Sequence, residues 1–187
     1  MKKERKKQII ALFILFFFFG SSTFAIVAFL PVPDNTTPQI PAGVGSIGST
    51  HEHADFKVYI NGNTIDFSQQ KYQVASPYIH VEDGNGNLIH VHATGETIGF
   101  FFDTLGMKFN STCFVLDTGE EFCNQDDRTL KFYVNDFTNN DFEKYLLKDL
   151  DQILISYGNE TEEQIQSQLD SITDDAYFEG RRGSILR

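Results

Sequence analysis

The sequence predicts an α+β fold, in which one N-terminal transmembrane helix precedes a small mixed or antiparallel sheet domain with one packed helix and a C-terminal helix. Three observations predict it. An uncharged apolar run occupies residues 9–30; short strand patterns closed by Gly, Asn or Asp begin near residue 51; and two helical patterns occur at residues 97–105 and 161–176. A length of 187 residues and 41% hydrophobic content allow one globular domain of ordinary size.

The first 30 residues predict a membrane anchor. Residues 9–30 extend about 33 Å as a helix, enough for a hydrocarbon core of about 30 Å. The basic residues of the preceding tail, residues 1–8, orient the N-terminus to the cytoplasm and the rest outside the cell membrane, as a single-pass protein. A cleaved secretory signal, with Ala25 and Ala28 near the cleavage site, is the alternative, but its apolar region is usually about 7–15 residues long.

Charge is divided sharply along the chain. Residues 1–7 hold five of the fifteen Lys and Arg and one of the 26 acids, so this stretch carries +4 and the remainder −15. An acidic exported portion repels phosphate backbones. We therefore expect no nucleic-acid partner; the expected partners are the membrane, through residues 9–30, and a membrane protein complex.

Beyond the anchor, the composition divides the chain into three parts. Residues 31–50 are rich in Pro, Gly, Ser and Thr and are typical of a linker. Residues 51–158 hold the strand patterns FKVYING, TIDF, YIHVED, NLIHVHA, CFVL, LKFYVN and QILISYG and form the expected α+β ectodomain. Residues 159–187 are expected to form a C-terminal helix and tail.

Two segments carry helix signals. Residues 97–105 begin with Thr and are followed by Gly106, a typical helix stop. Residues 161–176 place Ile165, Leu169 and Ile172 on one face, at spacings of four and three. The segment from Tyr177 to the C-terminus is not assigned.

All five histidines lie between residues 51 and 92, and a predicted hairpin brings three together. The turn Asp83-Gly84-Asn85-Gly86-Asn87 favours the positive φ values of a tight hairpin, and a midpoint at Asn85 sets His80 opposite His90. Side chains alternate along a strand, so His80, His90 and His92 share one face, exposed or turned towards a pocket, while the hairpin's Ile and Val residues face the core.

This face predicts a metal site. Opposed residues have Cβ atoms about 4.5–5.5 Å apart, so three imidazoles can reach one ion; His51 and His53, in an arm before the first strand, add a fourth ligand or a second site. Neutral imidazole suits copper or zinc, and Glu82 and Glu96 are candidates for an extra ligand or an acid or base. The plainer alternative is a set of solvated or structural histidines.

The two cysteines predict one disulfide. An extracytoplasmic location favours a bond between Cys113 and Cys123 across a hairpin that turns at Asp-Thr-Gly. Nine residues separate them, unlike the C-x-x-C of thioredoxin-like enzymes, so a structural bond is favoured over a catalytic one. Three sequons, at Asn35, Asn110 and Asn159, are candidate glycosylation sites of an exported protein.

The motifs HEHADFKVYING, YIHVEDGNG, IHVHATGETIGFFFDTLGM and DLDQILISYGNE resemble a family of membrane-anchored exported proteins of ammonia-oxidising archaea, with relatives in some bacteria. The resemblance covers about two thirds of the chain and implies an anchor with an ectodomain. Members are sometimes described as protein-disulfide isomerases. The order of a hairpin, a Thr-led helix, FYVND and KDLDQILIS is also similar to β-grasp sulfur-carrier domains, although their Gly-Gly terminus is absent.

Together these features predict an extracytoplasmic copper- or zinc-binding module that serves as an accessory, delivery or storage protein for a membrane or surface partner. Within the archaeal resemblance, a copper-dependent membrane monooxygenase is the implied client. Two alternatives stay open. One is an enzyme, either metal-dependent or a thiol-disulfide oxidoreductase; the other is a structural surface protein without metal.

Overall fold

The computed structural model describes residues 39–185, with backbone alone for 181–185. The predicted transmembrane segment at residues 9–30, the basic tail and the sequon at Asn35 lie outside the described residues. None of the helices in the described part is long and apolar enough to cross a membrane.

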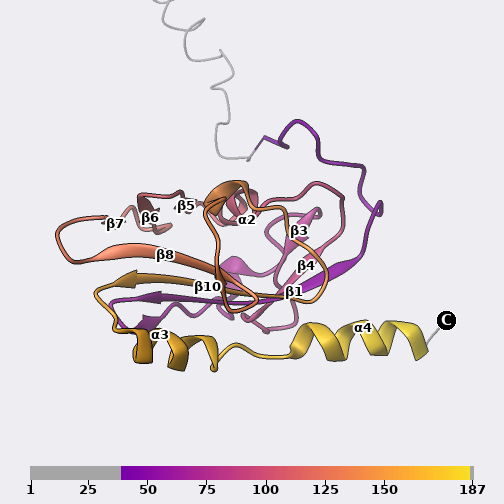
Figure 1. Ribbon diagram of the computed structural model, residues 1–187. Helices are drawn as coiled ribbons and strands as arrows, with labels where there is room; N and C mark the ends of the chain where they lie inside the picture. Colours follow the sequence, from indigo (N-terminus) through magenta and orange to yellow (C-terminus); the bar gives the residue numbers. More distant parts are fainter. Residues whose placement is uncertain (1–38, 186–187) are drawn as a thin grey trace, which may run out of the picture. The chain divides into compact units, whose positions relative to one another are not determined.

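The fold is a mixed α+β arrangement, as predicted, built on a seven-stranded sheet (Figure 1). The strand order is β3-β4-β1-β10-β8-β9, and β2 pairs with the end of β1. The central pair, β1 and β10, is parallel, whereas the pairs β1–β4, β3–β4 and β10–β8 are antiparallel. The strand bounds are β1 Glu52–Ile60, β2 Asn63–Thr64, β3 Ile79–His80, β4 Leu88–Val91, β8 Thr129–Val134, β9 Phe137–Thr138 and β10 Asp151–Gly158.

A second, three-stranded sheet joins β5 (Lys108–Phe109), β6 (Cys113–Val115) and β7 (Glu121–Cys123). It lies with α2 (Ile98–Thr104) on one side of the large sheet, whereas α3 (Glu162–Leu169) and α4 (Asp175–Ile185) lie on the other (Figure 1). Two short 3₁₀ turns, η1 (Gln70–Tyr72) and η2 (Phe142–Lys144), complete the elements.

Alternation along β1 supplies both faces of the sheet. Phe56 and Val58 enter the main core, where the ring of Phe56 lies 5.2 Å from that of Phe101 on α2. The intervening residues face α3 and α4; Tyr59, for example, packs against the small second core of Leu154 on β10 with Ile165 and Leu169. Both faces of the central strands are therefore buried, and a polar residue that faces α3 or α4 needs a specific partner.

The α2 helix forms where the sequence predicts it. The Thr97 side chain accepts a hydrogen bond from the backbone N–H of Phe100, which caps the helix at its start. Gly106, with φ of 73°, follows the last turn. Phe101 and Phe102 are fully buried, because Phe101 packs on Phe56 of the large sheet and Phe102 packs on Phe109 and Phe114 of the small one.

The single helix predicted over residues 161–176 is wrong: α3 ends at Leu169 and α4 begins at Asp175. The buried carboxylate of Asp55 on β1 explains the break. It accepts hydrogen bonds from the Thr173 hydroxyl and from the backbone N–H groups of Asp175 and Ala176, which start a new helix. The unassigned tail supplies the rest of α4.

Two connecting segments are attached to the sheet more closely than the sequence indicates. His51-Glu52-His53 was predicted as an arm before the first strand, yet β1 begins at Glu52. Within the predicted linker, the N–H of Gly45 donates to the carbonyl of Thr94, and the N–H of Gly48 to that of His92. These bonds hold the linker's final residues along the segment that follows β4.

The turn between β3 and β4 matches its composition. Asp83 and Gly84 have φ values of 55° and 73°, as this turn requires. Gly86 is needed for a different reason: a Cβ atom there would lie 2.5 Å from the carbonyl carbon of Phe67. The hairpin therefore packs directly on the chain that precedes η1.

Candidate metal centre

Three histidines lie in one row across neighbouring strands. His53 on β1 pairs with His90 on β4, and His90 pairs in turn with His80 on β3. Cross-strand partners point to the same face, here the face away from the main core. The register predicted from the turn, with His80 opposite His90, is confirmed. The pairing of His53 with His90 was not predicted.

All five imidazoles form a closed ring of contacts. The distances between ring centroids are 4.8 Å for His51–His53, 4.7 Å for His53–His90, 5.8 Å for His90–His80, 5.0 Å for His80–His92 and 5.0 Å for His92–His51. We call this set, His51, His53, His80, His90 and His92, the histidine ring. His51 and His53 therefore do not form a separate arm, because they are part of the same cluster as the predicted hairpin histidines.

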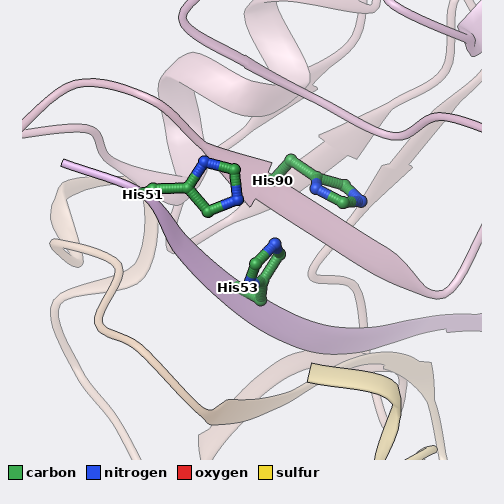
Figure 2. A group of neighbouring side chains, drawn as sticks. All are labelled: His51, His53 and His90. Carbon is green, nitrogen blue, oxygen red and sulfur yellow. The ribbon is translucent and has the colours of Figure 1, made fainter. Parts of the chain in front are cut away.

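His51, His53 and His90 form the group that can hold an ion. One ligand atom from each lies within 4.8 Å of the others. Figure 2 shows the three rings close together: His51 lies just before β1, His53 lies on β1, and His90 lies on the adjacent strand β4. Nitrogens bound tetrahedrally at about 2.0–2.1 Å lie about 3.3–3.4 Å apart, so these ligand atoms must move closer together to bind one ion. This group shares only His90 with the predicted trio of His80, His90 and His92.

The five histidines of the ring differ in their solvent exposure. His53 and His80 are each 5% exposed and His90 is 8% exposed, whereas His92 is partly exposed and His51 lies in solvent. An ion at His51, His53 and His90 would therefore have two buried ligands and one ligand, His51, in solvent. The sequence left open whether the histidine face is exposed or turned towards a pocket. In the structure most of this face is covered, and it is open to solvent at His51.

The environment keeps several of these imidazoles neutral. Burial lowers the pKa of His90 to about 4, and the other histidines nearby add to the effect against the opposing charge of Glu82. Burial also lowers the pKa of His53, with a further contribution from His51, and that of His92, with a contribution from His80. Neutral imidazole is the form that binds metals.

Acidic groups border the ring. The two carboxylate oxygens of Glu82 lie 3.2 Å from Nε2 of His80 and 3.6 Å from Nδ1 of His90, so this predicted extra ligand does lie at the site. An oxygen of Asp149 accepts a hydrogen bond from the backbone N–H of His53. Asp149 and Glu179 both act electrostatically on His53. Neither had been identified from the sequence, since each lies far from the histidines along the chain.

Glu96, the other predicted acid or ligand, is buried apart from these contacts. Its side chain is 1% exposed, and neither carboxylate oxygen has a hydrogen-bond partner among the described residues. Burial raises the pKa of Glu96 to about 7. The structure thus brings Glu82, but not Glu96, into hydrogen-bonding range of the ring.

The cysteines and sequons lie outside the ring. Cys113 and Cys123 form the predicted disulfide and face each other across β6 and β7. Asn110 accepts hydrogen bonds from the N–H groups of Thr112 and Cys113 through its side-chain oxygen. The side chain of Asn159 donates to Asp127. These contacts assign no catalytic role to the disulfide and leave glycosylation a prediction.

Comparison with known proteins adds no relative: no family model, no curated protein and no solved structure matches this chain.

Proposed function

We propose that this protein is a metal-binding module that takes up copper or zinc at His51, His53 and His90. The observation that carries the proposal is the convergence of these three side chains, with ligand atoms within 4.8 Å of one another, inside a ring that holds every histidine of the chain. Solvated histidines have no reason to converge from two neighbouring strands onto one space.

The ligand type supports copper or zinc. Imidazole nitrogens suit both ions, and the only two thiols of the chain are joined in a disulfide, so no thiolate is available to favour copper(I) or a cysteine-type zinc site. His90 lies at the centre of the row, with the backbone of β1 and β3 on either side. Strands position ligands more rigidly than loops do.

The proposed setting is the outer face of the cell membrane. The support comes from the apolar run at residues 9–30 after a basic start, and from a disulfide, which persists in oxidising compartments. There the module serves as an accessory, delivery or storage protein for a membrane or surface partner. We also propose that this chain is related to the membrane-anchored exported proteins of ammonia-oxidising archaea that its motifs resemble.

The architecture is proposed as a β-grasp variant. Its support is the path β4-β1-β10-β8-β9, in which the first and last long strands pair in parallel at the centre and one helix, α2, follows the first hairpin. The β3–β4 histidine hairpin supplies the strand beside β1. The three-stranded sheet and α3 and α4 are additions to that plan.

The test is metal titration of the purified full-length chain after removal of metal. We expect zinc or copper(II) to bind with at least one equivalent, and the electron paramagnetic resonance spectrum of bound copper(II) to show coupling to imidazole nitrogen. His51→Gln changes an exposed ligand and is expected to weaken binding by about tenfold or more. Glu163→Gln, at an exposed position of α3, is the control and leaves affinity unchanged.

Absence of binding to the wild-type chain would overturn the proposal. So would affinity that is equal in the wild-type, His51→Gln and His53→Gln chains, because it would place the metal elsewhere.

A further inference from the structure

The candidate metal group of His51, His53 and His90, called the inner group from here on, leaves part of the histidine ring unused. His80 and His92 are not members of it, and Glu82 lies beside them. These three residues come from the same hairpin, whereas His51 and His53 come from the start of β1. In the sheet, β3 and β1 lie on opposite sides of β4, so His80 and His53 flank His90 from opposite directions.

His80 is oriented as a ligand. Its Nδ1 lies 2.7 Å from the backbone carbonyl of Ser76, and this contact requires an N–H donor on Nδ1. The Nε2 atom is left facing the Glu82 carboxylate at 3.2 Å. Ligating imidazoles commonly donate one ring N–H to a backbone carbonyl and bind the metal through the other nitrogen.

The distances around Glu82 match a coordination shell. Two ligand atoms on one tetrahedral ion lie about 3.3–3.4 Å apart, and one oxygen of Glu82 lies 3.2 Å from Nε2 of His80. The other oxygen lies 3.6 Å from Nδ1 of His90, a member of the neighbouring group. The Glu82 side chain is 37% exposed, so an ion can approach it from solvent. His92 is the third candidate ligand, because its ring lies 5.0 Å from that of His80, although it lies equally far from the ring of His51.

The backbone of His92 is held at both polar groups. Its N–H donates to the carbonyl of Tyr78, and its carbonyl accepts from the N–H of Gly48. His92 follows β4 directly, yet these bonds hold it where its ring reaches both His80 and His51. The backbone of His92 is therefore fixed by hydrogen bonds, although this residue lies in the segment after β4.

We propose that the ring holds two metal ions: the inner one at His51, His53 and His90, and a second one at His80, Glu82 and His92. This inference rests on the proposed function and adds a second site of different chemistry. The inner site offers nitrogen ligands alone, whereas the second adds a carboxylate, which suits zinc and other hard or borderline divalent ions better than a soft one. His90 lies between the two.

The alternative is that Glu82 only forms ion pairs with neighbouring histidines and binds no metal. The two interpretations differ in stoichiometry. Two ions require two equivalents per chain, and they require weaker binding of the second equivalent when Glu82 is replaced by its uncharged isostere. An ion-pairing role leaves the stoichiometry at one.

The experiment is a titration of the metal-free, full-length chain with zinc, followed by elemental analysis of the protein. We expect two equivalents for the wild type. Glu82→Gln and His92→Gln, both at positions that are not fully buried, are expected to keep the first equivalent and weaken the second by at least about tenfold. His51→Gln affects the first instead. Circular dichroism and thermal unfolding of each metal-free variant establish that the fold is retained.

One equivalent in the wild type, lost in His51→Gln and unchanged in Glu82→Gln, would overturn the second site and leave the proposed function standing. No binding in the wild type would overturn both. Two equivalents that Glu82→Gln and His92→Gln leave intact would place the second ion outside this group and also reject the inference.

Discussion

His53 on β1 lies directly opposite His90 on β4, with their rings 4.7 Å apart and nearly perpendicular. This pair joins two parts of the sequence that the hairpin alone does not connect. His51 lies two residues before His53, so the same pairing places the exposed His51 near the buried His90. The geometry of the candidate site therefore depends on the pairing of β1 with β4.

Metal addition is expected to stabilise the fold. A ligand that binds the folded state alone, at a free concentration of one hundred times its Kd, adds about 2.7 kcal/mol to the free energy of unfolding. For a chain of this size we expect the Tm to rise by about 5–10 °C. Differential scanning fluorimetry with zinc checks this. The double variant His51→Gln/His53→Gln should show a clearly smaller rise, and an equal rise would contradict the assignment of the inner site.

Glu96 is expected to make stability depend on pH. Its pKa is raised from 4.5 in the unfolded chain to about 7 in the folded protein, so between these values the folded state holds a proton that the unfolded state has lost. The free energy of unfolding should therefore fall as the pH rises through this window, by about 3 kcal/mol in total.

Glu96→Gln separates this effect from other titrations. The variant is expected to lose the decline between about pH 4.5 and 7, as measured by urea unfolding at several pH values in the absence of metal. A decline of the same size in the variant would assign it to other groups.

Asp55 is expected to hold α4 on the sheet. Asp55→Ala removes three hydrogen bonds, from the Thr173 hydroxyl and the N–H groups of Asp175 and Ala176, and leaves these donors without their acceptor. Loss of a helix cap and of buried hydrogen bonds predicts a cost of about 2–3 kcal/mol. Compared with the wild type, the variant should show faster hydrogen exchange in residues 175–185 and little change elsewhere. Unchanged exchange in this helix would show that other contacts suffice to hold it.

The disulfide is expected to stabilise the fold without affecting metal binding. Cys113 and Cys123 are ten positions apart, and opening a loop of this length costs about 3 kcal/mol in a chain-entropy model. Urea unfolding of Cys113→Ala/Cys123→Ala measures the loss. A parallel zinc titration should give unchanged affinity. The small sheet lies on one side of the large sheet, whereas the histidines point to the other side, where α3 and α4 lie. Reduced affinity would link the two regions.

Local sequence was enough to predict the hairpin register. The turn Asp83–Asn87 marks its own centre, and strand alternation then places His80 opposite His90 with no knowledge of the rest of the fold. The α2 helix was equally accessible, because Thr97 and Gly106 are local start and stop signals. The disulfide followed from having only two cysteines, with a turn between them.

Long-range contacts account for what the sequence did not predict. The start of β1 has no clear apolar alternation, since HEHAD becomes a strand only by pairing with β4 and β10. The break between α3 and α4 depends on Asp55, about 120 positions away. Recognising the inner metal group required both the extended β1 and its register against His90.

The parallel pairing of β1 with β10 bears on how the protein acquires its structure in time. Ala54 meets Asp151, nearly a hundred positions later, whereas all the strands of the histidine ring come from residues 51–92. Contacts between distant positions form more slowly than contacts within a hairpin. In a chain synthesised from its N-terminus, the segments that carry the histidines are therefore made before β10 is. The histidine ring, which uses only β1, β3, β4 and the residues next to them, can then form before the sheet is complete.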